Sequence, residues 1–185
     1  MRERLADETR LLLVSRASAG VLTAERRTHE GWDAGLVDLH LDTGELVAKA
    51  DRSGAITLGR FGVGVLPIEL PEAVFERPAR MVDVRAALVA PVHTRDVAWN
   101  GDDAATVRAE LALEMAWALE VDGGRTPLGM PRLPPVPVEI DLTGDGFAVH
   151  AELRVRAPGE LWSWAGLVKL RDLTLVLAAA TPAPL

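Results

Sequence analysis

A run of fifteen residues in which every second side chain is apolar constrains this chain more than any other feature. The run extends from Val107 to Val121, and its four charged residues all fall at the intervening positions. Its alanine, leucine, glutamate and methionine content suits a helix. A helix would nevertheless scatter the charges around its circumference, whereas a strand places them all on one face. The pattern therefore favours a β-strand, with helix as the alternative, and Gly123-Gly124 ends the element on either interpretation.

A second alternating segment, residues 136–155, predicts a hairpin. Apolar and polar residues alternate on both sides of the turn cluster Thr143–Gly146. Pairing Leu142 with Phe147 puts the apolar side chains of both strands on one face. The same pairing sets Glu139 opposite His150 on the outer face.

A third segment, residues 36–50, predicts another hairpin. Alternation before and after Thr43-Gly44 indicates two strands with a turn between them. Pairing Leu41 with Leu46 would set Asp38 opposite Lys49, which is a favourable charge pair. Residues 52–54 turn the chain again and extend the hairpin into a three-strand meander.

Weaker signals complete the fold prediction. Residues 81–90 and 173–178 read as strands, and residues 71–75 as one helical turn. Residues 3–19 read as an amphipathic helix, although Leu11–Val14 suits a strand equally well. A straight strand over residues 107–121 would span ~50 Å, more than the ~41 Å width of a compact chain of this length. We therefore expect a mainly β fold: an antiparallel sheet of long, curved strands, as an open half-barrel, sandwich or tubular form, with one or two helices. Residues 1–180 would form a single domain and residues 181–185 a disordered tail.

Composition excludes several classes of function. The chain has no cysteine, which removes thiol nucleophiles and thiolate metal sites. Its formal net charge of −7, with arginine scattered, argues against nucleic-acid binding. No segment is apolar over the ~18–20 residues of a membrane span. The apolar run at residues 11–14 is too short for a signal peptide, so we expect a cytoplasmic protein.

No catalytic constellation can be assembled from the sequence. The four histidines, His29, His40, His93 and His150, show no metal-binding spacing. His40 and His150 stand at outward strand positions beside carboxylates, as solvated surface residues do. There is no nucleophile elbow and no phosphate-binding loop. We therefore expect no enzyme activity, no metal and no cofactor.

The apolar surplus instead suggests two functions. The first is a non-enzymatic binding protein for an apolar or lipid-like ligand in a β-lined cavity. The second is a structural protein that packs its sheets against copies of itself or against a partner chain. For the first function the expected binding residues are those that a strand would place on one apolar face: Leu111, Leu113, Met115, Trp117, Trp162 and Trp164.

Overall fold

The computed structural model describes residues 1–70, 77–128, 132–145, 148–164 and 168–182, and the side chain of Trp164 lies outside the description. Within these residues the only helices are two short 3₁₀ turns, η1 (Arg4–Ala6) and η2 (Ser15–Ala17). All the strands form one sheet. They are β1 (Thr9–Leu13), β2 (Ala19–Arg27), β3 (Trp32–Ala50), β4 (Ile56–Val65), β5 (Ile68–Glu69), β6 (Ala79–Leu88), β7 (Val92–Thr94), β8 (Val97–Asn100), β9 (Ala104–Leu111), β10 (Leu113–Val121), β11 (Gly124–Leu128), β12 (Val136–Gly144), β13 (Val149–Trp164) and β14 (Val168–Ala180).

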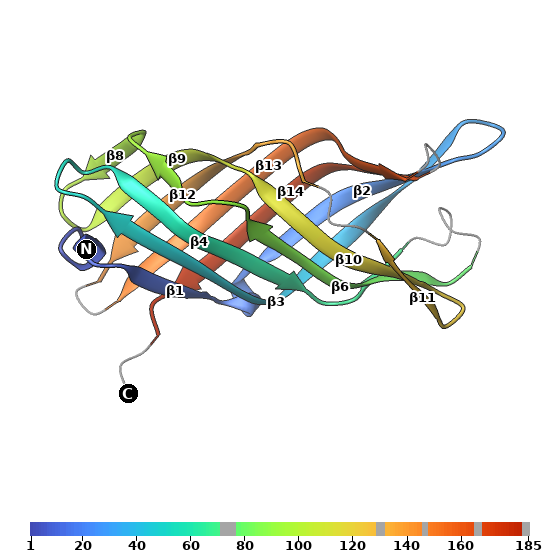
Figure 1. The fold of residues 1–185 in the computed structure, drawn as a ribbon, viewed down its shortest axis with the longest axis horizontal. Helices are drawn as coiled ribbons and strands as arrows, with labels where there is room; N and C mark the ends of the chain where they lie inside the picture. Colours follow the sequence, from blue (N-terminus) through green and yellow to red (C-terminus); the bar gives the residue numbers. More distant parts are fainter. Residues whose placement is uncertain (71–76, 129–131, 146–147, 165–167, 183–185) are drawn as a thin grey trace.

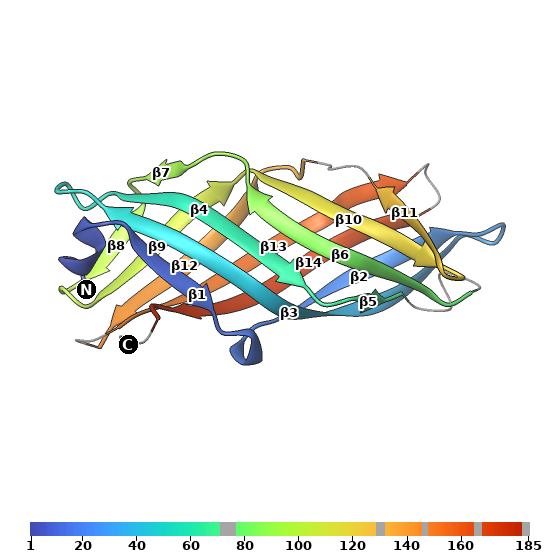
Figure 2. The same ribbon diagram turned by 60° about the horizontal axis from the view of Figure 1, so that its bottom comes forward.

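The sheet curls into an elongated, flattened tube (Figures 1 and 2). Its hydrogen-bonded neighbours run in the order β10-β6-β4-β3-β1-β14-β13-β12-β9. The two ends of that path, β9 and β10, are separated only by Ala112. The run predicted as one strand from residue 107 to residue 121 is therefore extended almost throughout, but it consists of two strands, β9 and β10, interrupted at Ala112; the two together are called the long strand below. Its first half pairs with β12 and its second half with β6, and this change brings the sheet back on itself.

Bulges provide the curvature that the length of this run demands. The pairing of β10 with β6 shifts between Ala116 and Ala118, opposite Asp83. A second shift, between Arg171 and Thr174, lies beside Asp172. Asp83 and Asp172 have φ angles of 54° and 53°. Aspartate tolerates this left-handed conformation better than most residues, and a bulge bends and twists the strand that contains it.

The predicted turn at Thr43-Gly44 is wrong, because both residues lie inside β3. That strand is 19 residues long and continues without a turn from Trp32 to Ala50. Consequently Asp38 lies opposite Val21 rather than Lys49, although the turn into β4 occurs as predicted. Gly44 serves close packing instead of a turn. A Cβ atom there would lie 2.9 Å from the Gly62 carbonyl oxygen of the neighbouring strand.

The hairpin of β12 and β13 forms, but with a different register. Leu142 pairs with Ala151 instead of Phe147, so His150 faces Thr143 and not Glu139. The amide of Ala148 donates to the Asp145 carboxylate, which closes a longer loop than the sequence suggested. The shift is four residues, an even number. Each side chain therefore keeps its predicted face despite the changed partner.

The weaker predictions have mixed outcomes. Strand β14 includes the segment predicted at residues 173–178, whereas β6 begins before the segment predicted at residues 81–90 and ends at Leu88, two residues short of it. Residues 3–19 do not form one helix, and the strand alternative holds: β1 contains Leu11–Leu13 of the predicted Leu11–Val14 and lies between the two 3₁₀ turns. The helical turn expected at residues 71–75 lies outside the described residues, as do residues 183–185 of the tail. Thr181 is tied to the sheet, because its amide donates to the Val149 carbonyl at 2.9 Å. Over the described part of the chain, we find no helix with the length and apolarity needed to cross a membrane.

The interior contains two apolar clusters. One includes Leu11, Val107 and Leu153. The other includes Met81 and Trp117. Met115, Val65, Leu173 and Leu175 pack against both clusters, and so mark the junction between them.

Candidate functional site

A small apolar cavity lies at the junction of the two clusters. Its volume is about 70 Å³. Its described lining residues are all alanine, valine, leucine, isoleucine, methionine, phenylalanine or tryptophan, and none of them carries a titratable group. Five of the six predicted binding residues line it: Leu111, Leu113, Met115, Trp117 and Trp162. For Trp164 the structure places only the backbone, which pairs with Val168.

The long strand positions four of these residues. The side chains of Leu111, Leu113, Met115 and Trp117 alternate with polar or small residues and point toward the tube interior. Trp162 comes from β13 on the other side of the cavity. Because the cavity lies where the strand changes its partner from β12 to β6, side chains from several strands must converge on one irregular junction. Close packing is hardest to achieve at such a place.

Two indole rings separate this cavity from a smaller one. Trp117 and Trp162 meet edge to face, with ring centroids 4.5 Å apart and planes inclined at 79°. Both rings also line a second apolar space of about 20 Å³, whose other walls include Leu70, Leu119 and Leu128. The tryptophan pair therefore forms a common wall between the two spaces.

The indole N–H of Trp117 has no hydrogen-bond partner among the described residues. Trp117 is only 5% exposed and its Nε1 atom is covered by protein atoms, so bulk solvent does not reach this donor. Trp99 shows the usual arrangement, since its Nε1 donates to the Gly54 carbonyl oxygen at 2.8 Å. A buried donor left unpaired destabilises a protein by ~1–3 kcal/mol. An orphaned indole N–H beside an apolar cavity is therefore a feature to explain.

The cavity is small for a ligand site. An engineered cavity of ~150 Å³ holds benzene, and drug-sized ligands occupy ~300–1,000 Å³. A guest larger than a few atoms would have to displace lining side chains. Met115 and Trp162 are only half-buried. Unbranched methionine side chains adapt readily to new packing, so Met115 and Met81 are suited to such a displacement.

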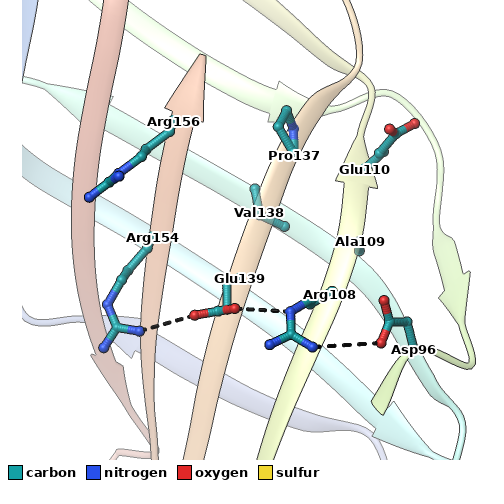
Figure 3. Close-up of a pocket in the computed structure, with 9 residues that line it drawn as sticks. All are labelled: Asp96, Arg108, Ala109, Glu110, Pro137, Val138, Glu139, Arg154 and Arg156. Atoms are coloured by element: carbon teal, nitrogen blue, oxygen red, sulfur yellow. Dashed lines mark hydrogen bonds and ion pairs between the residues drawn. The ribbon is translucent and has the colours of Figure 1, made fainter. Parts of the chain in front are cut away.

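A second candidate, on the outer face, is a shallow polar groove across β9, β12 and β13. Figure 3 shows its row of alternating charges, in which Glu139 lies between Arg108 and Arg154. Arg154 also contacts Glu152 and Asp141, and its hydrogen bond to Glu152 contributes most to raising the arginine's pKa. These charges neutralise one another across neighbouring strands. This arrangement is typical of a solvated sheet face.

The histidines do not form a site. All four are exposed, as predicted for His40 and His150. Among the described residues, no three histidine, aspartate or glutamate side chains are grouped so that they could bind a metal ion. His93 contacts the Thr57 hydroxyl, and His150 lies 3.3 Å from an Asp145 carboxylate oxygen.

The sequence analysis missed the wall opposite the long strand. Leu39, Phe61, Met81 and Leu175 belong to four other strands and also line the cavity. Alternation within each strand could have assigned these side chains to the interior. It could not have shown that they converge, because convergence depends on which strands are neighbours. Comparison of the chain with protein-family models, curated proteins and solved structures found no match.

Proposed function

We propose that the protein is a non-enzymatic binding protein for an apolar ligand, which it holds inside the tube at the junction of the two core clusters. The observation that carries this proposal is the wholly apolar cavity lined by Leu113, Met115, Trp117 and Trp162. An apolar guest gains free energy by leaving water, at ~25 cal/mol per Å² buried. It also restores dispersion contacts that the side chains around a void lack.

The size of the cavity limits the ligand. A compact guest would require the methionine side chains to change rotamer. A lipid-like chain would additionally require Trp162 to swing aside and join the two apolar spaces. In either case, binding competes with close packing for the same volume. A ligand that occupies this volume should therefore also raise the free energy of unfolding.

One observation favours the alternative, assembly with another copy or a partner chain. Leu12 on β1, Val14 just after β1 and Val176 on β14 are exposed, and the Val14 amide donates to the Ala178 carbonyl of β14. The patch is narrow, whereas stable interfaces bury ~800 Å² on each partner. Most apolar side chains of the described residues face the interior instead. The assembly function is therefore the second candidate.

Titration with toluene tests the binding proposal. In protein carrying ¹³C-methyl methionine, toluene should shift the methyl resonances of Met81 and Met115. Leu113→Trp should abolish these shifts by filling the cavity while leaving the fold intact. Leu36→Trp is the matched control, because Leu36 is 75% exposed and should affect neither binding nor folding.

Two results would contradict the proposal. The first is the absence of toluene shifts in the wild type together with a Leu113→Trp variant destabilised by ~1–3 kcal/mol, as overpacking predicts. Native mass spectrometry of the purified protein would then look for an oligomer, as the assembly alternative requires. The second is toluene binding that survives Leu113→Trp. That result would move the site away from this cavity, and Trp162 and Trp164 would be the next positions to change.

A further inference from the structure

We infer that the ligand is a neutral molecule with an apolar body and one hydrogen-bond acceptor, such as a ketone or ester carbonyl, which accepts from the indole N–H of Trp117. This inference rests on the proposed function and adds the chemical class of the ligand. It starts from the orphaned Nε1 atom of Trp117 in the wall of an otherwise apolar cavity.

The single unpartnered buried donor sets the number of polar groups on the ligand. Among the described lining residues, Trp117 and Trp162 carry the two side-chain N–H donors and no side chain carries an oxygen. Only the Trp117 donor is buried without a partner, so one acceptor on the ligand satisfies it. A second polar group on the ligand would be buried without a partner, which is unfavourable. An alcohol is disfavoured for the same reason, because its own O–H would lack an acceptor.

The absence of lining charges sets the charge of the ligand. Among the described residues, no arginine, lysine or histidine lines either apolar space, so a carboxylate or phosphate would be buried without a counter-ion from them. Ion pairs, such as that between Arg108 and Glu139, lie on the outer face of the sheet. A free fatty acid is therefore a poor ligand, whereas its uncharged ester is compatible with the site.

Trp162 is the side chain that must move. The Nε1 atom of Trp117 is fully covered in the ligand-free protein, and the ring of Trp162 lies against the Trp117 ring. Rotation of Trp162 would connect the two spaces and uncover the donor for the incoming acceptor. Because Trp162 is only half-buried, this rotation removes less packing than moving Trp117 would.

Three small aromatic probes of similar size test the inference: acetophenone, ethylbenzene and benzoate. We expect acetophenone and ethylbenzene to bind and benzoate to bind at least roughly tenfold more weakly than either. In a ¹H–¹⁵N spectrum, acetophenone should move the Trp117 indole proton downfield, and ethylbenzene should not. The resonance is assigned by its loss in Trp117→Phe. The same variant should lower the acetophenone-to-ethylbenzene affinity ratio about tenfold, as loss of a hydrogen bond to a buried donor predicts.

Trp99→Phe is the matched control, because the Trp99 indole already donates to Gly54 and its loss should leave the ratio unchanged. Should Trp117→Phe fail to fold, the Trp117 indole resonance is assigned from through-space contacts in the wild-type spectrum, and its shift still decides the question. Binding of both neutral probes without that shift, or with a ratio that Trp117→Phe leaves unchanged, would overturn the inference and leave the proposed function standing. Failure of both neutral probes to bind would refute the proposed function as well.

Discussion

Filling the cavity with one extra methylene group should stabilise the protein and weaken ligand binding at the same time. Val84 lines the cavity and is 4% exposed, so the methylene group that Val84→Ile adds should enter the cavity. At ~24 cal/mol per Å³, the 70 Å³ cavity lowers the stability of the fold by ~1.7 kcal/mol. One buried methylene contributes ~0.8 kcal/mol. The expected gain is therefore up to ~0.8 kcal/mol, about half of what the void removes.

Urea denaturation of the wild type and two variants measures this gain. Val107→Ile is the matched control, since Val107 is 0% exposed and lines neither apolar space. The same methylene added there should overpack the core and cost ~1–3 kcal/mol. The urea concentration at the midpoint of unfolding should rise for Val84→Ile and fall for Val107→Ile. The dependence of the free energy of unfolding on urea concentration should be equal for all three proteins. Equal destabilisation by the two substitutions would mean that the cavity is not empty volume, and would refute the reasoning.

Two further predictions concern stability. Trp117→Ala should lower the free energy of unfolding by ~3–5 kcal/mol, whereas His150→Ala on the outer face should change it by less than ~0.5 kcal/mol. Chemical denaturation of both variants measures these changes. A large loss for His150→Ala would contradict the placement of His150 on the outer face. Burial raises the pKa of Glu45, but hydrogen bonds from Arg60 and Arg10 outweigh burial and leave the pKa lowered. The stabilisation from Glu45 is therefore present above its ordinary pKa of ~4.3 and lost as the pH falls through the lowered value. At pH 7, Glu45→Gln should be less stable than the wild type by up to ~1 kcal/mol, and well below pH ~4 the two proteins should be equally stable. Urea denaturation at both pH values measures the difference. A difference in stability that persists in acid would argue against a role for the ionised Glu45 carboxylate.

Local pattern was enough to predict which side chains face the interior, but not which strands are neighbours. The alternation of apolar residues placed Leu113, Met115 and Trp117 on the cavity side, and this assignment survives the change of partner at Ala112. The turn predicted at Gly44 failed because glycine serves two purposes. It permits tight turns, and it also lets a neighbouring backbone approach closely, as Gly62 does here.

The same limit applies to the candidate site. The register of β12 and β13 depends on a loop whose Asp145 carboxylate accepts from the Ala148 amide, a contact that no alternation of apolar residues encodes. Phe61 and Leu175 lie far apart in the sequence, and only the closure of the sheet brings them to one cavity. Partner choice between distant strands is a property of the whole chain, and a single sequence shows only its local part.

The pairing of the first strand with the last has a consequence for synthesis on the ribosome. Leu12 of β1 lies opposite Ala180 of β14, and β2 also borders β14. At ~5–20 residues per second, the partner of β1 emerges ~10–30 s after β1 itself. During that interval the N-terminal strands have an unpaired edge, which is the feature most prone to pair with another chain. The tube can close only once β14 has been synthesised, so the nascent chain should depend on chaperones that cover exposed strand edges.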